Sequence, residues 1–208
     1  MKNQEQIIYV VDDDMSVCRA LKLLLEGHAF RVETFSCAAD FLIFKHPLKP
    51  SCLILDIQLP GISGLELQEA MAAQQLIIPI VFITGHGDIP MSVKAMQGGA
   101  IDFLPKPFTE KKLLNAIERS IAKNRIQNKQ QAEIFRIKRH IKTLSPREME
   151  VFRLVAGGLL NKQIASKRGT ALQTIKVHRS RVMQKMQAKT VTELIRFAQK
   201  TGITSIAD

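Results

Sequence analysis

The sequence predicts an α/β domain with a doubly wound, five-stranded parallel sheet, joined by a helical linker to a small all-α helix-turn-helix domain. Strand and helix patterns alternate five times in about the first 120 residues, whereas the last part of the chain holds helical patterns alone. Charge divides the chain at the same place. Residues 1–124 hold 12 Lys and Arg against 14 Asp and Glu, and residues 125–208 hold 18 against 5. These observations favour two domains with different surfaces.

Each expected strand is a short apolar run, followed by apolar residues at helical spacing. The first, residues 7–11, ends in three acids, and Val17, Leu21 and Leu24 then recur at intervals of three and four up to Gly27. The expected strands are residues 7–11, 31–34, 52–56, 79–84 and 101–104, and the first three helices are expected after residue 14, from residue 38 and after residue 64. Such alternation is typical of a parallel sheet with helices on both faces.

Polar side chains lie where the expected strands end. Asp12 and Asp13 follow the first strand, Asp56 ends the third, Thr84 ends the fourth and Lys106 follows the fifth. Because open parallel sheets bind ligands outside the carboxyl ends of their strands, we expect these residues to meet at one edge. Asp56 alone has two interpretations, a site carboxylate or a strand-end residue that only caps the next turn. The matching residues on the neighbouring strands favour the first.

The residue types in this group predict its ligands. Carboxylates crowded into one small site repel one another unless a cation lies among them. Carboxylate oxygens without His or Cys favour Mg²⁺, which usually takes one or two carboxylates and leaves other positions to water and phosphate oxygens. The ammonium of Lys106 and the hydroxyl of Thr84 suit a phosphoryl group. We therefore expect Mg²⁺ at this edge and a phosphoryl group on Asp56.

Residues 5–122 resemble the receiver domain of two-component response regulators. The motifs that agree in type, spacing and order are VVDDD at 10–14, LDIQLPGISG at 55–64, ITGHGD at 83–88 and DFLPKPF at 102–108. The resemblance implies a flavodoxin-like fold and phosphorylation of Asp56 by a sensor histidine kinase. It also implies that Asp12, Asp13 and Asp56 hold Mg²⁺, with the backbone oxygen of Gln58 as a further ligand.

The same resemblance implies roles for residues at the fourth and fifth strands. Thr84 and Lys106 would bind the phosphoryl oxygens, Thr84 and Phe103 would switch conformation on phosphorylation, and the Lys106–Pro107 bond would be cis. An X-Pro bond gives up its trans preference at little cost, and the cis form would aim Lys106 into the site. The alternative for Phe103 is an ordinary core residue, since the fifth strand is mostly apolar.

Other polar residues near these motifs are expected to be structural or solvated. Asp14 is expected to start the first helix, where the macrodipole favours an acid. Asp88 and Asp102 are expected at loop edges in water. His86 is a lone histidine in a glycine-flanked loop and is expected to be exposed rather than a ligand.

Cysteine use and hydropathy predict a cytoplasmic protein without a membrane partner. Cys18, Cys37 and Cys52 show no paired spacing and are expected to be small hydrophobic residues in a reducing compartment. No signal peptide precedes Ile7, and no apolar run approaches the ~18 residues that a membrane span requires. The basic surplus after residue 124 predicts a polyanion partner, and nucleic acid fits better than a membrane surface.

The two domains are expected to be joined by a helix. The expected boundaries are a receiver-like domain at 1–122, a helical linker at 123–141 and a DNA-binding domain at 142–208. No Gly or Pro lies between Pro107 and Pro146, and Ala, Lys, Glu, Gln and Arg dominate, which favours a helical spacer over a flexible tether. The apolar repeat is shorter than three or four heptads, so a coiled-coil dimer is only weakly indicated.

The second domain begins with a complete helix start. Ser145 is expected as N-cap, with Pro146 at the first helical position and Glu148 closing a capping box. Asn161 is expected to cap a short second helix that is broken at Gly169. Turn chemistry thus predicts two short helices before the longest one of this domain.

A basic helix is expected over residues 172–186. Its Ile175, Val182 and Met186 share an inward face. The residues of the opposite face are Lys176, Val177, Ser180, Arg181 and Gln184. A short helix, a turn and a basic helix in this order describe a helix-turn-helix, whose second helix enters the major groove of double-stranded DNA.

Residues 140–204 resemble the LuxR-type DNA-binding domain, in the branch of regulators typified by FixJ. The motifs are LSPRE, GLLNKQIA, TIKVHRSRVMQKM and the last helix. The resemblance implies that Lys176, Val177 and Ser180 face base edges and that Thr174, Arg179 and Lys185 lie nearer phosphates.

The sequence departs from the family pattern at two places. In the turn before the basic helix, the family usually has two apolar residues and a Ser or Thr cap, whereas this chain has Arg168, Thr170 and Ala171; the cap is therefore expected at Thr170. Ser180 stands where relatives are often basic, so Arg181 is expected to contact DNA instead.

Three functions are compatible with these motifs. The resemblance favours a transcription factor that is controlled by phosphorylation. On phosphorylation it would form a homodimer through residues 90–121 and bind a two-fold promoter site. RNA polymerase is an expected partner, and activation of expression is the usual outcome for such relatives. An aspartate-type phosphatase would use Asp56 as nucleophile, but its chemistry requires a second acid where Gln58 stands, so no enzyme is expected. A binding module with an unphosphorylated Asp56 is disfavoured by the complete set of acids, Thr84 and Lys106.

Overall fold

The computed structural model describes residues 6–85 and 89–203. The chain divides into two compact units, Met1–Lys129 and Gln130–Asp208, and each is described by itself. His86 and Asp88, which the sequence predicts in an exposed loop, lie outside the described residues.

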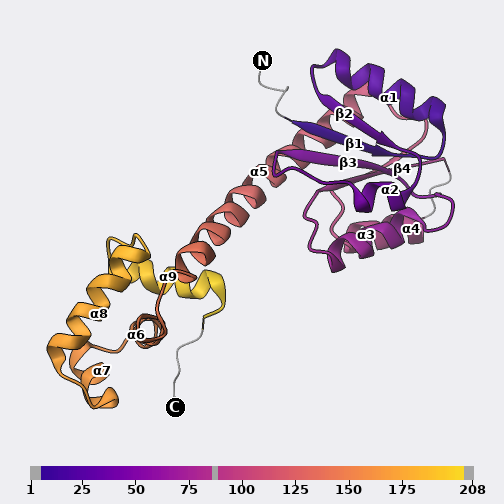
Figure 1. The fold of residues 1–208 in the computed structure, drawn as a ribbon. Coiled ribbons are helices and arrows are strands. Elements are labelled where there is room, and N and C mark those ends of the chain that lie inside the picture. The colour runs from indigo at the N-terminus through magenta and orange to yellow at the C-terminus, as the bar shows by residue number, and fades with distance from the viewer. Residues whose placement is uncertain (1–5, 86–88, 204–208) are drawn as a thin grey trace. The chain divides into compact units, whose positions relative to one another are not determined.

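The first unit contains a five-stranded parallel sheet in the order β2-β1-β3-β4-β5 (Figure 1). This confirms the predicted doubly wound α/β fold. The strands are β1 (Ile7–Val11), β2 (Arg31–Phe35), β3 (Ser51–Asp56), β4 (Ile80–Thr84) and β5 (Asp102–Pro105). The helices are α1 (Met15–Gly27), α2 (Ala38–Ile43), α3 (Gly64–Ala73), α4 (Ile89–Gln97) and the first part of α5 (Glu110–Ile141). The fifth strand lies one residue later than predicted.

Two apolar cores cover the two faces of this sheet, because successive strand residues point to opposite sides. Tyr9 and Phe82 pack with residues of α2, α3 and α4, whereas Ile54 and Ile83 pack with residues of α1 and α5. Figure 1 shows α1 on one side of the sheet and α2, α3 and α4 on the other. Every residue of β1, β3 and β4 is buried, as a sheet covered on both faces requires.

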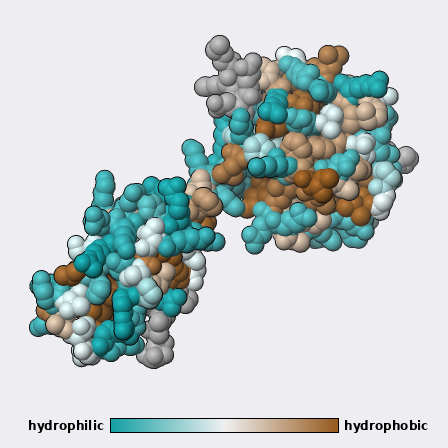
Figure 2. Space-filling view, viewed as in Figure 1, coloured by the Kyte–Doolittle hydropathy of each residue, from teal (hydrophilic) through white to brown (hydrophobic). Residues whose placement is uncertain are grey.

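The described residues of the second unit form helices and no strands, as predicted. It contains the last part of α5 together with α6 (Pro146–Ala156), α7 (Asn161–Arg168), α8 (Leu172–Lys185) and α9 (Val191–Thr201). Each helix contributes to one core: Ile137 from α5, Phe152 from α6, Ile164 from α7, Val182 from α8 and Leu194 from α9. Hydrophilic side chains cover most of the face of this unit that Figure 2 shows.

The predicted start of α6 is confirmed. The Ser145 hydroxyl accepts a hydrogen bond from the Glu148 backbone N–H at 3.3 Å, and the Glu148 carboxylate accepts one from the Ser145 backbone N–H at 2.8 Å. This capping box satisfies two of the backbone donors that a helix start leaves without partners, and Pro146 lacks such a donor.

The predicted caps of α7 and α8 are wrong by one residue. Leu160 is the N-cap of α7, so Asn161 is already helical, and its side-chain oxygen accepts a hydrogen bond from Arg179 at 2.7 Å instead. Ala171 is the N-cap of α8. Thr170 closes the end of α7, where its N–H donates to a backbone oxygen of that helix at 3.1 Å.

The expected linker lies within one continuous helix, α5, of 32 residues. Its composition predicted this, because the segment lacks the residues that break helices. In the described part of the chain, no helix is both long and apolar enough to cross a lipid bilayer.

Candidate functional site

The strand register brings the predicted polar residues to one edge of the sheet. β1 and β3 pair so that Asp12 and Asp56 follow at the same level. β4 and β5 pair Thr84 with Pro105, the residue before Lys106. Parallel strands end together in this way because their hydrogen-bonded ladders advance residue by residue. Asp12, Asp56, Thr84 and Lys106 therefore come from four neighbouring strands.

Lys106 joins the two aspartates. Its Nζ lies 2.7 Å from Asp12 Oδ2 and 2.9 Å from Asp56 Oδ1. Asp12 is 1% exposed and Asp56 6%, so both carboxylates have lost most of their water. Two buried carboxylates this close repel each other and require a cation between them. The Lys106 ammonium is that cation, and it binds both carboxylates through charge-assisted hydrogen bonds.

The second oxygen of each carboxylate is held by the backbone. Asp12 Oδ1 accepts a hydrogen bond from the Asp14 N–H at 2.9 Å, and Asp56 Oδ2 accepts one from the Gln58 N–H at 2.6 Å. Asp14 caps α1 as predicted, with its carboxylate 2.7 Å from the Ser16 N–H. The loops after β1 and β3 thus fix both carboxylates in orientation.

Burial and pairing change the ionisation of this group. Burial raises the pKa of Asp12 above its usual range, and the hydrogen bonds from Lys106 and Asp14 oppose this effect without cancelling it. Burial lowers the pKa of Lys106, but its hydrogen bonds to Asp12 and Asp56 outweigh burial, and the pKa rises above its usual range. The Lys106 ammonium therefore stays protonated near neutral pH.

The structure brings two of the three predicted acids together. Asp13 is exposed, and no hydrogen bond joins it to Asp12, Asp56 or Lys106. Within residues 6–85 and 89–203, no group of three or more His, Cys, Asp or Glu side chains is arranged to hold a metal ion. Two carboxylates that converge on one cation still fit Mg²⁺, which usually takes one or two and completes its shell with water.

Thr84 and the following turn complete the edge. Thr84 is fully buried, and its backbone oxygen accepts a hydrogen bond from the Lys106 N–H at 2.7 Å. The Lys106–Pro107 peptide bond is cis, as predicted.

The role of Gly64 near the site was not predicted from the sequence. It begins α3, and its N–H donates to the Ile57 backbone oxygen at 2.9 Å. A Cβ at this position would lie 2.3 Å from the Asp56 backbone oxygen. Only glycine permits this approach, so Gly64 positions the loop that carries Asp56. The signal was the second glycine of the PGISG turn, eight residues after Asp56.

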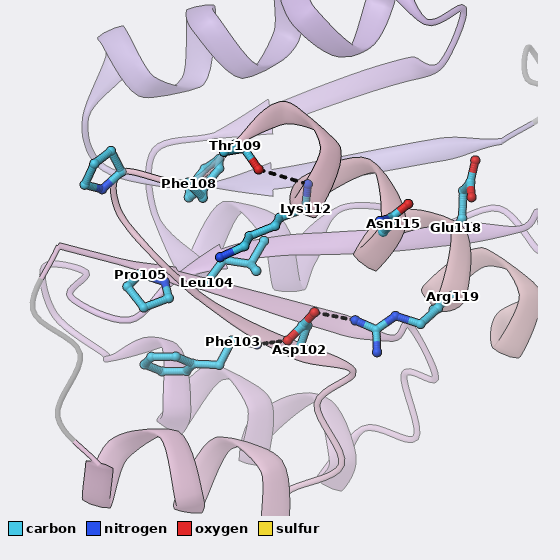
Figure 3. Close-up of a pocket in the computed structure, with 11 residues that line it drawn as sticks. Asp102, Phe103, Leu104, Pro105, Phe108, Thr109, Lys112, Asn115, Glu118 and Arg119 are labelled. Atoms are coloured by element: carbon cyan, nitrogen blue, oxygen red, sulfur yellow. Dashed lines mark hydrogen bonds and ion pairs between the residues drawn. The ribbon is translucent and has the colours of Figure 1, made fainter.

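β5 and the start of α5 line a pocket of about 800 Å³, and two of its lining residues, Pro105 and Pro107, flank Lys106 in the sequence. Phe103 is half-buried against the core that contains Tyr9. Figure 3 shows Phe103 directed away from Phe108 and Arg119. Asp102, expected in water, is instead half-buried and forms an ion pair with Arg119, because α5 passes beside β5 (Figure 3).

The predicted DNA-facing residues of α8 fall into two groups. The exposed group consists of Thr174, Lys176, Val177, Ser180 and Arg181. Inward-facing Ile175 and Val182 are buried, which confirms the predicted face. The exposed side of α8 therefore carries a cation at positions 176 and 181, with small side chains between them.

Arg179 and Lys185 form the second group, because both have partners inside the domain. Arg179 donates to Asn161 at 2.7 Å. Lys185 Nζ lies 2.6 Å from Glu148 Oε2 and 3.1 Å from the Thr143 backbone oxygen. The hydrogen bond from Lys185 and the capping box lower the pKa of Glu148, which is buried. Lys185 thus connects the end of α8 with the start of α6.

The unusual turn between α7 and α8 uses charge in place of apolar packing. Arg168 forms an ion pair with Glu150 of α6, and Arg147 lies 3.4 Å from the other oxygen of the same carboxylate. Arg168 is exposed, so the stem of this side chain lies at the domain surface.

Family comparisons match both units. The response regulator receiver domain matches residues 8–118, and the luxR family of bacterial regulatory proteins matches residues 142–198. The chain is a response regulator. It therefore belongs to the family of two-component response regulators with a LuxR-type DNA-binding domain, which regulate transcription.

This response regulator has similar relatives along almost its whole length. Nodulation protein W of Bradyrhizobium diazoefficiens is 45% identical over 199 residues, which cover 96% of this chain and 88% of that protein. FixJ of the same organism is 41% identical over 196 residues, covering 94% and 96%. Among solved structures, StyR has a TM-score of 0.79 at 46% identity, covering 94% of this chain and 99% of StyR. Full-length FixJ from B. japonicum has a TM-score of 0.54 at 39% identity, covering 95% and 97%.

Proposed function

We propose that this response regulator receives a phosphoryl group on Asp56 from a sensor histidine kinase and then binds promoter DNA as a homodimer. The observation that carries the proposal is the convergence of Asp12 and Asp56 on Lys106 at the carboxyl edge of the sheet. Such an edge is where open α/β sheets bind their ligands. The buried and oriented Asp56 carboxylate is a suitable nucleophile for phosphorus.

In the proposed transfer, a bond forms from an Asp56 oxygen to phosphorus as the bond from phosphorus to the kinase histidine nitrogen breaks, and that nitrogen keeps the electron pair. Asp12, Asp13, Asp56 and the Gln58 backbone oxygen would hold Mg²⁺, which when bound neutralises charge on the phosphoryl oxygens. Lys106 would leave Asp56 and follow one of these oxygens, since its ammonium attracts the new charge. The chain acts as a phosphoryl acceptor rather than as an enzyme.

Phosphorylation would then act at a distance. The Thr84 hydroxyl would bind another phosphoryl oxygen, and half-buried Phe103 would follow as the switch residue. The surface formed by residues 90–121 would dimerise the receiver domains, and paired DNA-binding domains would contact a two-fold site. We assign 1–122 to the receiver, 123–141 to the linker and 142–208 to DNA binding, in a cytoplasmic activator that works with RNA polymerase.

Asp56→Asn tests the acceptor. The variant keeps the size of the side chain but removes the nucleophilic carboxylate, so a small phosphodonor with Mg²⁺ should no longer label the protein. Intact mass spectrometry measures the label. Asp40→Asn is the matched control, because it makes the same substitution at an exposed position of α2, outside the group around Lys106. Labelling of Asp56→Asn at the control level would disprove the assignment.

Lys176→Ala tests base reading by α8. A residue that reads a base should lose about 1 to 3 kcal/mol of specific binding when truncated, whereas a phosphate contact weakens binding to all sequences alike. Titration of a selected site and a random duplex separates the two outcomes. Equal losses on both duplexes would reassign Lys176 to the backbone.

A further inference from the structure

The last part of α5 carries a cationic face within the second unit. We call the four exposed cations Arg136, Lys138, Arg139 and Lys142 the α5 cationic face. None of the four forms an ion pair with another described residue. Arg136 is close enough to Glu133 to help lower the pKa of that carboxyl, after the larger effect of Lys200. Four cations within seven residues repel one another and attract a polyanion.

Neighbouring residues of the same helix fix it to the second unit. Ile137 is buried in its core. Glu133 forms an ion pair with Lys200 of α9. His140 Nδ1 lies 2.8 Å from the Lys185 backbone oxygen at the end of α8. These contacts hold the helix in place, so the cations on its outer side present a defined surface rather than a flexible tail.

The helix macrodipole explains only part of this charge. Cations are favoured in the last turn of a helix, and Lys138, Arg139 and His140 lie there. Arg136 precedes that turn, and Lys142 follows the last helical residue. The last turns of α6, α8 and α9 carry one basic residue each, and that of α7 carries two. The α5 cationic face therefore exceeds what stabilisation of a helix end requires.

Its position indicates what it binds. His140 and Thr143 contact Lys185, so the end of α5 adjoins the carboxyl end of α8. A recognition helix in the major groove has a phosphate backbone on each side of it. The α5 cationic face thus adjoins the helix that would lie between these two backbones. We propose that the α5 cationic face binds backbone phosphates of double-stranded DNA next to the site that α8 enters; this inference rests on the proposed insertion of α8.

The experiment measures how binding depends on salt. The test variant is full-length protein with Arg136→Gln, Lys138→Gln and Arg139→Gln; Gln keeps helix propensity. Affinity for a labelled random-sequence duplex is titrated over a series of salt concentrations. Each phosphate contact contributes about 0.9 to the slope of log K against log salt, so the slope should decrease by up to about 2.7. A random duplex suffices because phosphate contacts do not read sequence.

A matched control removes the same charge elsewhere. Arg19→Gln, Lys45→Gln and Lys49→Gln replace three exposed cations of the first unit that lie outside residues 90–121, and the slope should remain that of the wild type. Circular dichroism must show equal helicity for both triple variants. An unchanged slope for the α5 variant, or an equal decrease in the control, would overturn the inference.

Two further outcomes separate the inference from the proposed function. Phe135 is 71% exposed beside these cations, and Phe and Arg are enriched in protein interfaces. If a protein partner occupies the face, the α5 variant binds DNA with the wild-type slope, and the inference fails alone. If the wild type shows no salt-dependent binding to any duplex, the proposed DNA binding fails together with the inference.

Discussion

Gly64→Ala tests how closely α3 approaches the strand that carries Asp56. A Cβ at residue 64 would lie 2.3 Å from the Asp56 backbone oxygen and 3.0 Å from the Ile57 Cα. Backbone atoms cannot rotate away, so β3 and α3 must separate. Overpacking of this kind costs about 1 to 3 kcal/mol. We expect the free energy of unfolding of the first unit to fall by about this amount, and phosphoryl uptake by the displaced Asp56 to slow.

Tyr9 makes the measurement specific for the first unit. It is the only tyrosine, it is fully buried in β1, and the chain has no tryptophan. Urea unfolding followed by tyrosine fluorescence therefore reports on this unit. Gly27→Ala is the control, because a Cβ there meets no atom within 4 Å. Its stability should stay equal or rise by up to about 1 kcal/mol. Equal stability of the two variants would refute the argument from close approach.

Other variants test the ion pairs. Lys106→Met should destabilise the first unit by about 3 to 5 kcal/mol, since it leaves two buried carboxylates without their cation; urea unfolding should show that Mg²⁺ stabilises this variant more than the wild type. The hydrogen bond from Lys185 lowers the pKa of Glu148 in the folded protein. The ionised Glu148 carboxylate therefore stabilises the fold fully above its usual pKa of 4.5, and this stabilisation is lost as the pH falls through the lower pKa of the folded state. Glu148→Gln should reduce this acid loss in far-UV circular dichroism, and an unchanged pH profile would contradict the assignment. Arg168→Leu should change the stability of the second unit by less than about 1 kcal/mol, because its ion pair with Glu150 is partly exposed; a larger loss on thermal melting would show that the turn depends on it.

The sequence predicted which residues meet at the carboxyl edge of the sheet, because the apolar runs and the parallel register together determine this edge. Apolar runs fix the strands, and parallel register then brings their last residues to one level. Neither the apolar runs nor the strand register could predict that the Asp13 side chain is exposed. Asp12 hydrogen-bonds to the Asp14 N–H, which turns the chain there into α1 and leaves the intervening side chain in solvent. The direction of one residue in such a turn depends on backbone angles that composition does not encode.

The bridging position of Lys106 also required the structure. Its ammonium is placed by hydrogen bonds to Asp12 after β1 and Asp56 at the end of β3, residues that lie far from Lys106 in the sequence. The predicted N-caps of α7 and α8 were wrong for a more local reason. Residues such as Asn161 and Thr170 favour caps in general, but where the chain turns depends on packing, and a shift of one residue changes the cap.

Partners on other helices limit what a helical pattern can predict about α8. The pattern separates inward from outward residues, but it cannot show which outward cations are already paired. Lys185 is such a case, because Glu148, a member of the α6 capping box, binds its ammonium. Substitution of Lys185 would change both charge at the DNA surface and the attachment of α8 to α6. A loss of DNA affinity in such a variant would therefore identify a phosphate contact only if the salt slope decreased by about 0.9.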